Sequence, residues 1–390
     1  MATSALAVRP NPLPTFAFPG LFYNSLVHNT QPHAAKKSWD VLVIGGGIIG
    51  VSLALALRKR GATVLVIERG EPGREASSAA GGMLVEYGEE TPPALQPLAL
   101  ASARLYPEFA HEVEMESGMK VDLRDQGAIV FPENAHAADM QGKASFLSRQ
   151  QLSELEPALA DAGRPALFVK ERSVDPRALT AAAIKAARHR GVDFSSGDPV
   201  VRVNLSDGRA GGVTTSKTSF LGDKIVNCAG AWSSAIPPYH LPTRPVKGQM
   251  LCLAMQPREL VKHVVRSPDV YLIPRSDGRL LAGATVEEAG FNKQTDSATM
   301  QRLHHAALAL VPALRDARIL EDWAGLRPGT PDALPILGAT ETPGCYAATG
   351  HFRDGILLAP ITAEVMTAIL ENRKPEFDLS PFSPSRFSPA

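Results

Sequence analysis

The chain has 390 residues, of which 44% are hydrophobic and 21% are charged, and its formal net charge is zero. This composition suits a globular protein of one large domain or two interleaved domains, and the neutral balance argues against nucleic acid as the main partner because no basic excess exists to neutralise phosphates. The sequence contains no run of about 18 apolar residues, so no transmembrane helix is predicted. The three scattered cysteines lack the spacing of a disulfide framework or a zinc site, and the histidines lack the spacing of a metal site.

The first 39 residues differ in composition from the rest of the chain. Residues 1–39 contain no Asp or Glu, are rich in Ala, Pro, Ser, Thr and Asn, and carry positive charge on Arg9, Lys36 and Lys37. An acid-free, hydroxyl-bearing leader without a continuous apolar segment is typical of an organelle transit peptide. The scarcity of arginine favours the chloroplast over the mitochondrion. A disordered tail is the alternative interpretation.

A strand–helix–strand unit is predicted directly after this leader. Residues 41–44 and 62–67 are short apolar runs with β-branched residues, typical of buried parallel strands. The apolar segment between them has the length of a helix and ends at Gly61. Parallel strands joined by a helix indicate an α/β fold.

The turn of this unit carries a phosphate-binding fingerprint. Gly45, Gly47 and Gly50 have the spacing GxGxxG, which permits a tight turn and brings a pyrophosphate close to the helix N-terminus. Glu68 closes the second strand and is placed to accept hydrogen bonds from a ribose. The acid favours NAD or FAD over NADP, although the adjacent Arg69 leaves NADP open.

The next segment, residues 71–88, consists of small residues without hydrophobic periodicity. Ser77, Gly81 and Gly82 would let the backbone lie against a flat, wide ligand, for which a nicotinamide dehydrogenase has no obvious need. The segment therefore disfavours a nicotinamide cofactor, and a flexible loop is the alternative interpretation of the segment.

Further along the chain, the patterns predict a discontinuous arrangement. We expect helices at 94–116, 147–159, 175–191 and 355–370, antiparallel strands within 242–320, a buried strand at 345–348 and a disordered C-terminal tail. The expected organisation is a transit peptide (1–39), a Rossmann-like, doubly wound dinucleotide-binding domain (40–115, 171–240 and 325–375), an α+β substrate domain with an antiparallel sheet (116–170 and 241–324) and a tail (376–390).

Two arginines lie in unusual surroundings. Arg327 occurs in WAGLRPGTPDALPILG and Arg353 in GHFRDGILLAP, among apolar and turn-forming residues. A guanidinium keeps its charge at any working pH and is rarely buried without a partner. The two arginines therefore predict an anionic ligand.

In this order, the chain contains the motifs VIGGGIIG, SSAAGGML, VYLIPR, GRLLAGAT, WAGLRPGTPDALPILG and GHFRDGILLAP. This series resembles the D-amino-acid oxidase family, and within it the glycine oxidases of the thiamin pathway, from about Asp40 to Leu370. The resemblance implies a two-domain fold with non-covalent FAD. It also implies a substrate whose carboxylate is held by a tyrosine and arginines above the flavin.

The resemblance also implies a set of site residues. Tyr271 and Arg327 would hold the substrate carboxylate, with Arg353 assisting. Contacts to FAD would come from the turn and acid named above, from the small-residue segment, from one adenine contact and from the turn before the last helix. These residues are Gly45, Gly47, Ile48, Ile49, Gly50, Glu68, Arg69, Ser77, Gly81, Gly82, Met83, Val200, His351, Phe352, Arg353, Asp354, Gly355, Ile356 and Leu357.

The activity implied is oxidative deamination of glycine, sarcosine or a small D-amino acid to a 2-oxo acid, ammonia or an amine, and H₂O₂, with O₂ as the acceptor. A dehydrogenase with another acceptor and a non-catalytic flavin-binding assembly factor are the alternatives. Two positions depart from the glycine oxidases, since Val286 replaces a methionine and Asp269 a histidine, which leaves the preferred amino acid open. The sequence also leaves homo-oligomer formation open.

We predict that residues 1–39, fused to a reporter protein, direct it to plastids, and that the mature chain begins between Lys36 and Asp40. Fluorescence microscopy of the fusion and N-terminal sequencing of the imported protein measure these two outcomes. A cytosolic reporter would contradict the targeting prediction, whereas a mitochondrial one would contradict only the choice of organelle.

Overall fold

The structure is a computed structural model that describes residues 37–86, 91–133, 144–160 and 163–387. Most of the expected transit peptide therefore lies outside the described residues. Ser38 and Trp39, which were expected to belong to it, instead form the start of the first strand. Trp39 is buried and its indole Nε1 donates to Asp193 at 2.7 Å, so the folded part begins earlier than expected.

The first sheet is mainly parallel and is built from three separate stretches of the chain. Its strands lie in the order β17-β18-β11-β1-β2-β8, and the hairpin β9–β10 continues from β11. The parallel neighbours of β1 are β2 and β11, so the carboxyl ends of these three strands meet at one edge. The strands are β1 (Ser38–Ile44), β2 (Val64–Glu68), β8 (Asp193–Ser196), β9 (Val200–Ser206), β10 (Arg209–Thr215), β11 (Ser219–Asn227), β17 (Ile336–Ala339) and β18 (Cys345–Thr349).

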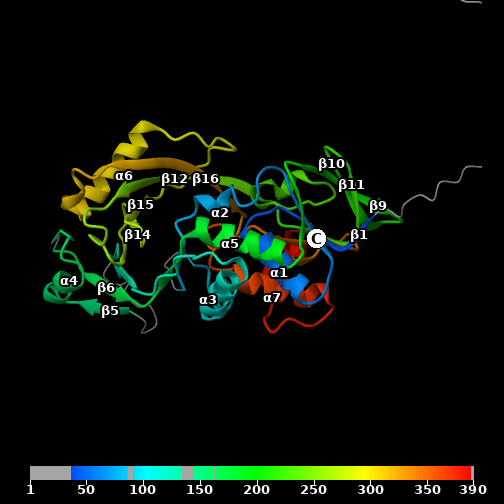
Figure 1. Cartoon of the computed structure of the whole chain (residues 1–390), viewed down its shortest axis with the longest axis horizontal. Coiled ribbons are helices and arrows are strands. Elements are labelled where there is room, and N and C mark those ends of the chain that lie inside the picture. Colours follow the sequence, from blue (N-terminus) through cyan, green and yellow to red (C-terminus); the bar gives the residue numbers. More distant parts are fainter. Residues whose placement is uncertain (1–36, 87–90, 134–143, 161–162, 388–390) are drawn as a thin grey trace, which may run out of the picture. The chain divides into compact units, whose positions relative to one another are not determined.

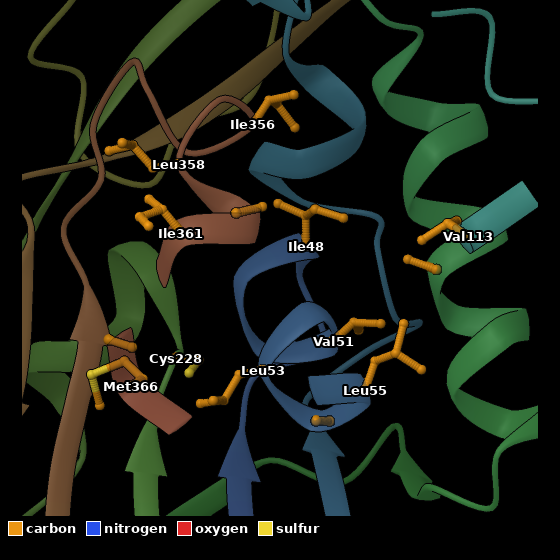
Figure 2. Close-up of a cluster of buried hydrophobic side chains, with 14 of the residues drawn as sticks. Ile48, Val51, Leu53, Leu55, Val113, Cys228, Ile356, Leu358, Ile361 and Met366 are labelled. Carbon is orange, nitrogen blue, oxygen red and sulfur yellow. The ribbon is translucent and has the colours of Figure 1, made fainter. Parts of the chain in front are cut away.

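Four helices pack together with this sheet: α1 (Ile48–Lys59), α3 (Gln96–Ser117), α5 (Pro176–His189) and α7 (Ala359–Leu370). In Figure 1 they lie next to one another beside β1. Their apolar faces form the largest buried cluster, and Figure 2 shows Ile48 and Val51 of α1, Val113 of α3 and Met366 of α7 among its side chains. This core fixes the position of α1 relative to the end of β1.

The second sheet is largely antiparallel, in the order β16-β12-β15-β14-β13-β4-β6-β5. One of its faces packs against α6 (Ser297–Leu310), and α4 (Arg149–Leu155) lies beside β5. The strands are β4 (Ala128–Val130), β5 (Ala144–Leu147), β6 (Ala166–Val169), β12 (Arg244–Ala254), β13 (Val264–Arg266), β14 (Tyr271–Pro274), β15 (Arg279–Gly283) and β16 (Ile319–Gly329).

Short elements connect these layers. The single helical turn α2 follows β2, and the two-residue strands β3 and β7 pair with each other. These elements are α2 (Ala76–Ala79), β3 (Met83–Leu84), β7 (Arg172–Ser173), and the 3₁₀ turns η1 (Pro93–Leu95), η3 (Gly230–Ala235), η4 (Pro312–Leu314), η5 (Ser380–Phe382) and η6 (Pro384–Phe387). The whole arrangement confirms the expected α/β fold with an additional antiparallel sheet.

The expected helix starts agree with the structure where capping residues mark them. Asp175 accepts hydrogen bonds from the backbone N–H groups of Arg177 and Ala178 at the start of α5. Ser148 and Gln151 form a reciprocal capping box at the start of α4.

Three expectations are wrong. The last helix begins at Ala359 rather than at residue 355, because residues 350–358 form turns. Strand β16 runs on to Gly329 and pairs with β12, so Arg327 belongs to the antiparallel sheet, although it was expected in the dinucleotide-binding domain. The described part of the C-terminal tail is packed: Phe382 is buried, and Arg386 pairs with Asp332 at 2.7 Å.

Over the residues that the structure describes, none of the helices has both the length and the apolar character needed to cross a membrane.

The close packing of α1 on β1 gives a stability prediction. A methyl group at Gly50 would overlap with the carbonyl oxygen of Gly45, so Gly50→Ala should push α1 away from the strand and lower the free energy of unfolding by about 1–3 kcal/mol. Gly211 in β10 is the control, because a methyl group there meets no atom within 4 Å. Denaturant unfolding of both variants measures the difference, and equal stability of the two would contradict the packing argument.

Candidate active site

A cavity of ≈ 920 Å³ lies where the carboxyl ends of β1 and β11 face the second sheet. Its walls come from the glycine turn after β1, from residues 75–85, from strands β12, β14 and β16, and from the turn after β18. In open α/β sheets, ligands bind at the carboxyl ends of the parallel strands. The volume is at the upper end of the usual range for small-molecule sites, as a dinucleotide requires.

The N-terminus of α1 opens onto this cavity. Gly45 has φ +110°, and a side chain there would overlap with the backbone of Cys228, so only glycine fits the turn. The N–H of Ile48 donates to Ser77 Oγ at 2.9 Å. A helix N-terminus binds phosphate oxygens in this way. Gly47 and Ile48 line the cavity at this helix N-terminus, which therefore suits a pyrophosphate.

Glu68 is held rigidly beside that turn. Its Oε2 accepts from the Gly46 N–H at 2.8 Å and its Oε1 from the Gly70 N–H at 2.9 Å, and the side chain is buried. The neighbouring Arg69 places its guanidinium 4.3 Å from the centre of the Trp232 ring. The carboxylate is thus fixed at the cavity wall, where a ribose would reach it.

The small-residue segment is tightly packed against the second sheet. A methyl group at Gly81 would lie 2.6 Å from Ile273 Cδ1, and the Gly81 carbonyl accepts from Arg275 Nη2 at 2.5 Å. The Gly82 carbonyl accepts from the Val174 N–H at 2.9 Å. The absence of side chains at the two glycines is therefore what allows the backbone to lie between the cavity and the sheet.

Tyr271 and Arg327 meet on the cavity face of the second sheet. Arg327 Nη1 donates to the backbone carbonyls of Thr285 at 3.0 Å and Lys247 at 3.3 Å. A side chain at Gly248 would overlap with the guanidinium, so the glycine makes room for it. Burial raises the pKa of Tyr271, although Arg327 opposes the rise, so the phenol stays protonated and can donate a hydrogen bond.

The Arg327 fork has further donors to offer. In the described part of the chain, both backbone carbonyls that bind Arg327 accept from Nη1, the Tyr271 hydroxyl is its side-chain neighbour, and Arg327 itself lines the cavity. A guanidinium carries five N–H groups in a planar fork that matches a carboxylate. Nε and Nη2 can therefore bind an anionic ligand within the cavity.

The turn after β18 closes the cavity on the side of α7. Its Phe352 N–H donates to the Pro328 carbonyl at 3.0 Å, which ties the turn to β16. Burial raises the pKa of Asp354 to about 6, against the opposing effect of Arg353. Burial lowers the pKa of His351 to about 3, so this imidazole is neutral, and its Nε2 lies 3.0 Å from Thr362 Oγ1.

All but two of the expected site residues line the cavity. The exceptions are Gly50 and Leu357. Gly50 faces the Gly45 carbonyl and serves helix–strand packing. Leu357 is buried, and its carbonyl accepts from Ser102 Oγ of α3 at 2.5 Å, which directs this part of the turn away from the cavity.

Several lining residues were not identified from the sequence, among them Gly248, Met250 and Gly283 on the second sheet and Trp232 after β11. The two glycines interrupt strand patterns, and a glycine inside a strand signals close approach of another group, so they could have been found. Met250 and Trp232 carry no such signal. Asp269 and Val286, the two departures noted above, also line the cavity.

A protein-family model described as FAD dependent oxidoreductase matches residues 40–369. The chain therefore belongs to this family, and FAD is its cofactor. The site fits FAD, because the helix N-terminus, the fixed Glu68 carboxylate and the closely packed glycine segment lie along one cavity. Within the described residues, no group of three or more His, Cys, Asp and Glu side chains is arranged to hold a metal ion.

Individual relatives are similar over most of the chain. Glycine oxidase of Geobacillus kaustophilus is 32% identical over 366 residues, 89% of this chain and 97% of that protein. Its crystal structure covers 90% of this chain and 100% of its own, with a TM-score of 0.85. Hydrogen cyanide synthase subunit HcnC of Pseudomonas aeruginosa is 30% identical, covering 91% of this chain and 97% of that protein.

The bifunctional protein ThiO/ThiG of Synechocystis sp. is 36% identical over 357 residues, which are 89% of this chain but 54% of that protein. The chain thus spans about half the length of the bifunctional relatives it matches.

The site predicts how FAD is held. The purified protein should be yellow and release all of its FAD on denaturation, because burial raises the pKa of the Cys228 thiol in the cavity wall and keeps it from attacking the flavin as a thiolate. Gly47→Val should abolish FAD retention, since a Cβ at Gly47 already lies 3.1 Å from Ser77 Oγ and larger groups would fill the pyrophosphate site. Gly211→Val is the control. Flavin absorbance per protein measures retention, and an equally yellow Gly47→Val protein would contradict the assignment.

Proposed function

We propose that the protein catalyses the FAD-dependent oxidative deamination of a small amino acid such as glycine, sarcosine or a small D-amino acid. The reaction consumes O₂ and water, and the products are a 2-oxo acid, ammonia or an amine, and H₂O₂. The observation that carries the proposal is the pairing of Arg327 and Tyr271 on the sheet face that borders the FAD cavity. The relatives named glycine oxidase support the same activity.

In this proposal, Arg327 binds the substrate carboxylate through a bidentate pair and Tyr271 donates a further hydrogen bond. Arg353, on the turn after β18, also lines the cavity and assists. FAD, which the N-terminus of α1 and the wall beside Glu68 would hold, would supply the two-electron oxidising capacity for a substrate whose amine is neutral. The contribution of the chain is positional: it holds the α-carbon in one orientation and so lowers the entropic part of the barrier.

The same geometry bears on the alternatives. A non-catalytic assembly factor needs no carboxylate-binding pair, so Tyr271 and Arg327 count against that reading. A dehydrogenase would use the same substrate residues and differ only in the electron acceptor. Formation of one H₂O₂ per substrate oxidised by the purified protein supports the oxidase, whereas turnover only with an added quinone or dye would support the dehydrogenase.

The acid-free composition of residues 1–39 supports a location in the chloroplast, which we propose together with this activity.

Replacement of Arg327 tests the proposed function. Arg327→Met should retain FAD but lose about 30- to several-thousand-fold in kcat/KM, because loss of a charged partner from a buried pair costs about 2–5 kcal/mol. Arg327→Lys should recover little, since an ammonium lacks the planar fork. Arg353→Met should have a smaller effect. Arg318, exposed just before β16, supplies the control variant Arg318→Met.

Steady-state kinetics with the best substrate from a screen of glycine, sarcosine and D-amino acids measure these effects. An amine without a carboxylate should be a poor substrate of the parent protein, and its kcat/KM should be the same in Arg327→Met. Parental kinetics of Arg327→Met with amino acids would contradict the assignment.

A further inference from the structure

A buried group of polar side chains lies behind Arg327, on the face of β12 that points away from the cavity. Successive residues of a strand face opposite sides. Gly248 and Met250 of β12 line the cavity, whereas Lys247 and Gln249 point to the other side. Only 4% of Lys247 and none of Gln249 is exposed, so both polar side chains need partners inside the protein.

Glu287 supplies those partners from the loop between β15 and α6. Its Oε1 accepts from Gln249 Nε2 at 2.7 Å and from Thr285 Oγ1 at 2.5 Å, and its Oε2 lies 3.4 Å from Lys247 Nζ. The backbone N–H and carbonyl of Glu287 also pair with those of Lys247, both at 2.9 Å. A single carboxylate thus joins the loop to β12.

The charge of Glu287 is needed at this place. Lys247 is a buried cation, and an uncompensated buried charge is strongly unfavourable. Burial raises the pKa of Glu287, but hydrogen bonds from Thr285 and Gln249 and the charge of Lys247 outweigh this effect and leave the pKa below its ordinary value. Glu287 is therefore ionised at neutral pH and balances Lys247.

The same group is anchored on a third side. Gln249 Oε1 accepts from the Asp296 N–H at 2.9 Å, and Gln249 Nε2 donates to Asp296 Oδ2 at 2.9 Å. Asp296 caps the start of α6 through the Thr299 N–H. Gln249 of β12 thereby joins the loop that carries Glu287 to the start of α6.

This group controls the two atoms that hold Arg327. The acceptors of Arg327 Nη1 are the backbone carbonyls of Lys247 and Thr285, which are two of the three residues whose side chains Glu287 contacts. If the Glu287 side chain loses its bonds, the loop is held to β12 only by the backbone pair of Glu287 and Lys247 and by the Gln249 N–H bond to Thr285 Oγ1. The orientation of the guanidinium is then less firmly fixed.

We propose that Glu287 is a positioning residue for substrate binding, which through Lys247 and Thr285 fixes the Arg327 guanidinium in the orientation that accepts a carboxylate. The inference rests on the proposed function, because it takes Arg327 as the carboxylate-binding residue.

The test uses the FAD-loaded protein and glycolate, a carboxylate that carries a hydroxyl in place of the amine of glycine. Glu287→Gln keeps the shape of the side chain but replaces one carboxylate oxygen with an NH₂ group. In one orientation the NH₂ group faces Lys247 Nζ, and in the other it faces the donors Gln249 Nε2 and Thr285 Oγ1. The Kd of glycolate, followed by the change in flavin absorbance, should rise about 10- to 100-fold, as expected for loss of a charged hydrogen-bonding group. Glu287→Asp, which keeps the charge, should recover part of the loss.

The matched control is Glu288→Gln in the same loop. Glu288 is exposed, pairs with Arg244 at 3.2 Å and lies outside the cavity lining. The Kd of glycolate for Glu288→Gln should therefore equal the Kd for the parent protein. Thr285→Val is a second variant for the case in which Glu287→Gln does not retain FAD. It removes the hydroxyl bound to Glu287, keeps the carbonyl, and should raise the Kd several-fold. If Glu287→Gln retains FAD and binds glycolate with the parental Kd, the proposal is overturned. If Glu287→Gln does not retain FAD, a parental Kd of glycolate for Thr285→Val overturns the proposal.

A double variant separates positioning from a general structural role. In the Arg327→Met background, Glu287→Gln should cause no further rise in the Kd, because its effect passes through Arg327. An additive rise would overturn the proposal. An unchanged Kd in Arg327→Met alone would instead contradict the proposed function, whereas an Arg327-dependent Kd that is insensitive to Glu287→Gln would contradict only the positioning role.

Discussion

The Arg327 guanidinium, held by two backbone carbonyls at the border of the FAD cavity, is the interaction on which the organisation of the site depends. A permanent positive charge in a partly buried position requires acceptors, and both backbone carbonyls that bind Arg327 in the described part of the chain accept from the same nitrogen, Nη1. The remaining donors then attract a carboxylate. This unsatisfied part of the fork is what turns a flavin-binding fold into a candidate amino-acid oxidase.

The two sheets contribute different things to this arrangement. The parallel sheet provides strand ends, a helix N-terminus and the fixed Glu68 carboxylate, which suit the phosphates and ribose of FAD. The antiparallel sheet provides the face that carries Tyr271 and Arg327. Gly248 of β12 has no side chain and so leaves room for the Arg327 guanidinium. The second face of β12 carries the contacts of the buried Lys247 and Gln249 with Glu287, so β12 supports the binding residue that the neighbouring strand β16 presents.

The sequence predicts the parts of this structure that local patterns determine. The glycine turn, Glu68 and the helix start at Asp175 each follow from a few neighbouring residues. The surroundings of Arg327 predicted an anionic ligand, and the resemblance to a known family added Tyr271 and the role of Arg327 in binding a carboxylate. By contrast, the strand partner of Arg327, the late start of α7 and the packing of Phe382 depend on contacts between distant segments. The Glu287 group is of the same kind, since no spacing reveals that a loop carboxylate meets two side chains of β12.

The most direct measurement is a crystal structure of the FAD-bound protein with glycolate. The account predicts that the glycolate carboxylate lies against the flavin-facing wall, with its oxygens about 3 Å from Arg327 Nε or Nη2 and from the Tyr271 hydroxyl. Arg327 Nη1 should keep its bonds to Lys247 and Thr285. Glycolate bound elsewhere in the cavity, with the Arg327 fork turned to protein acceptors only, would contradict the central claim.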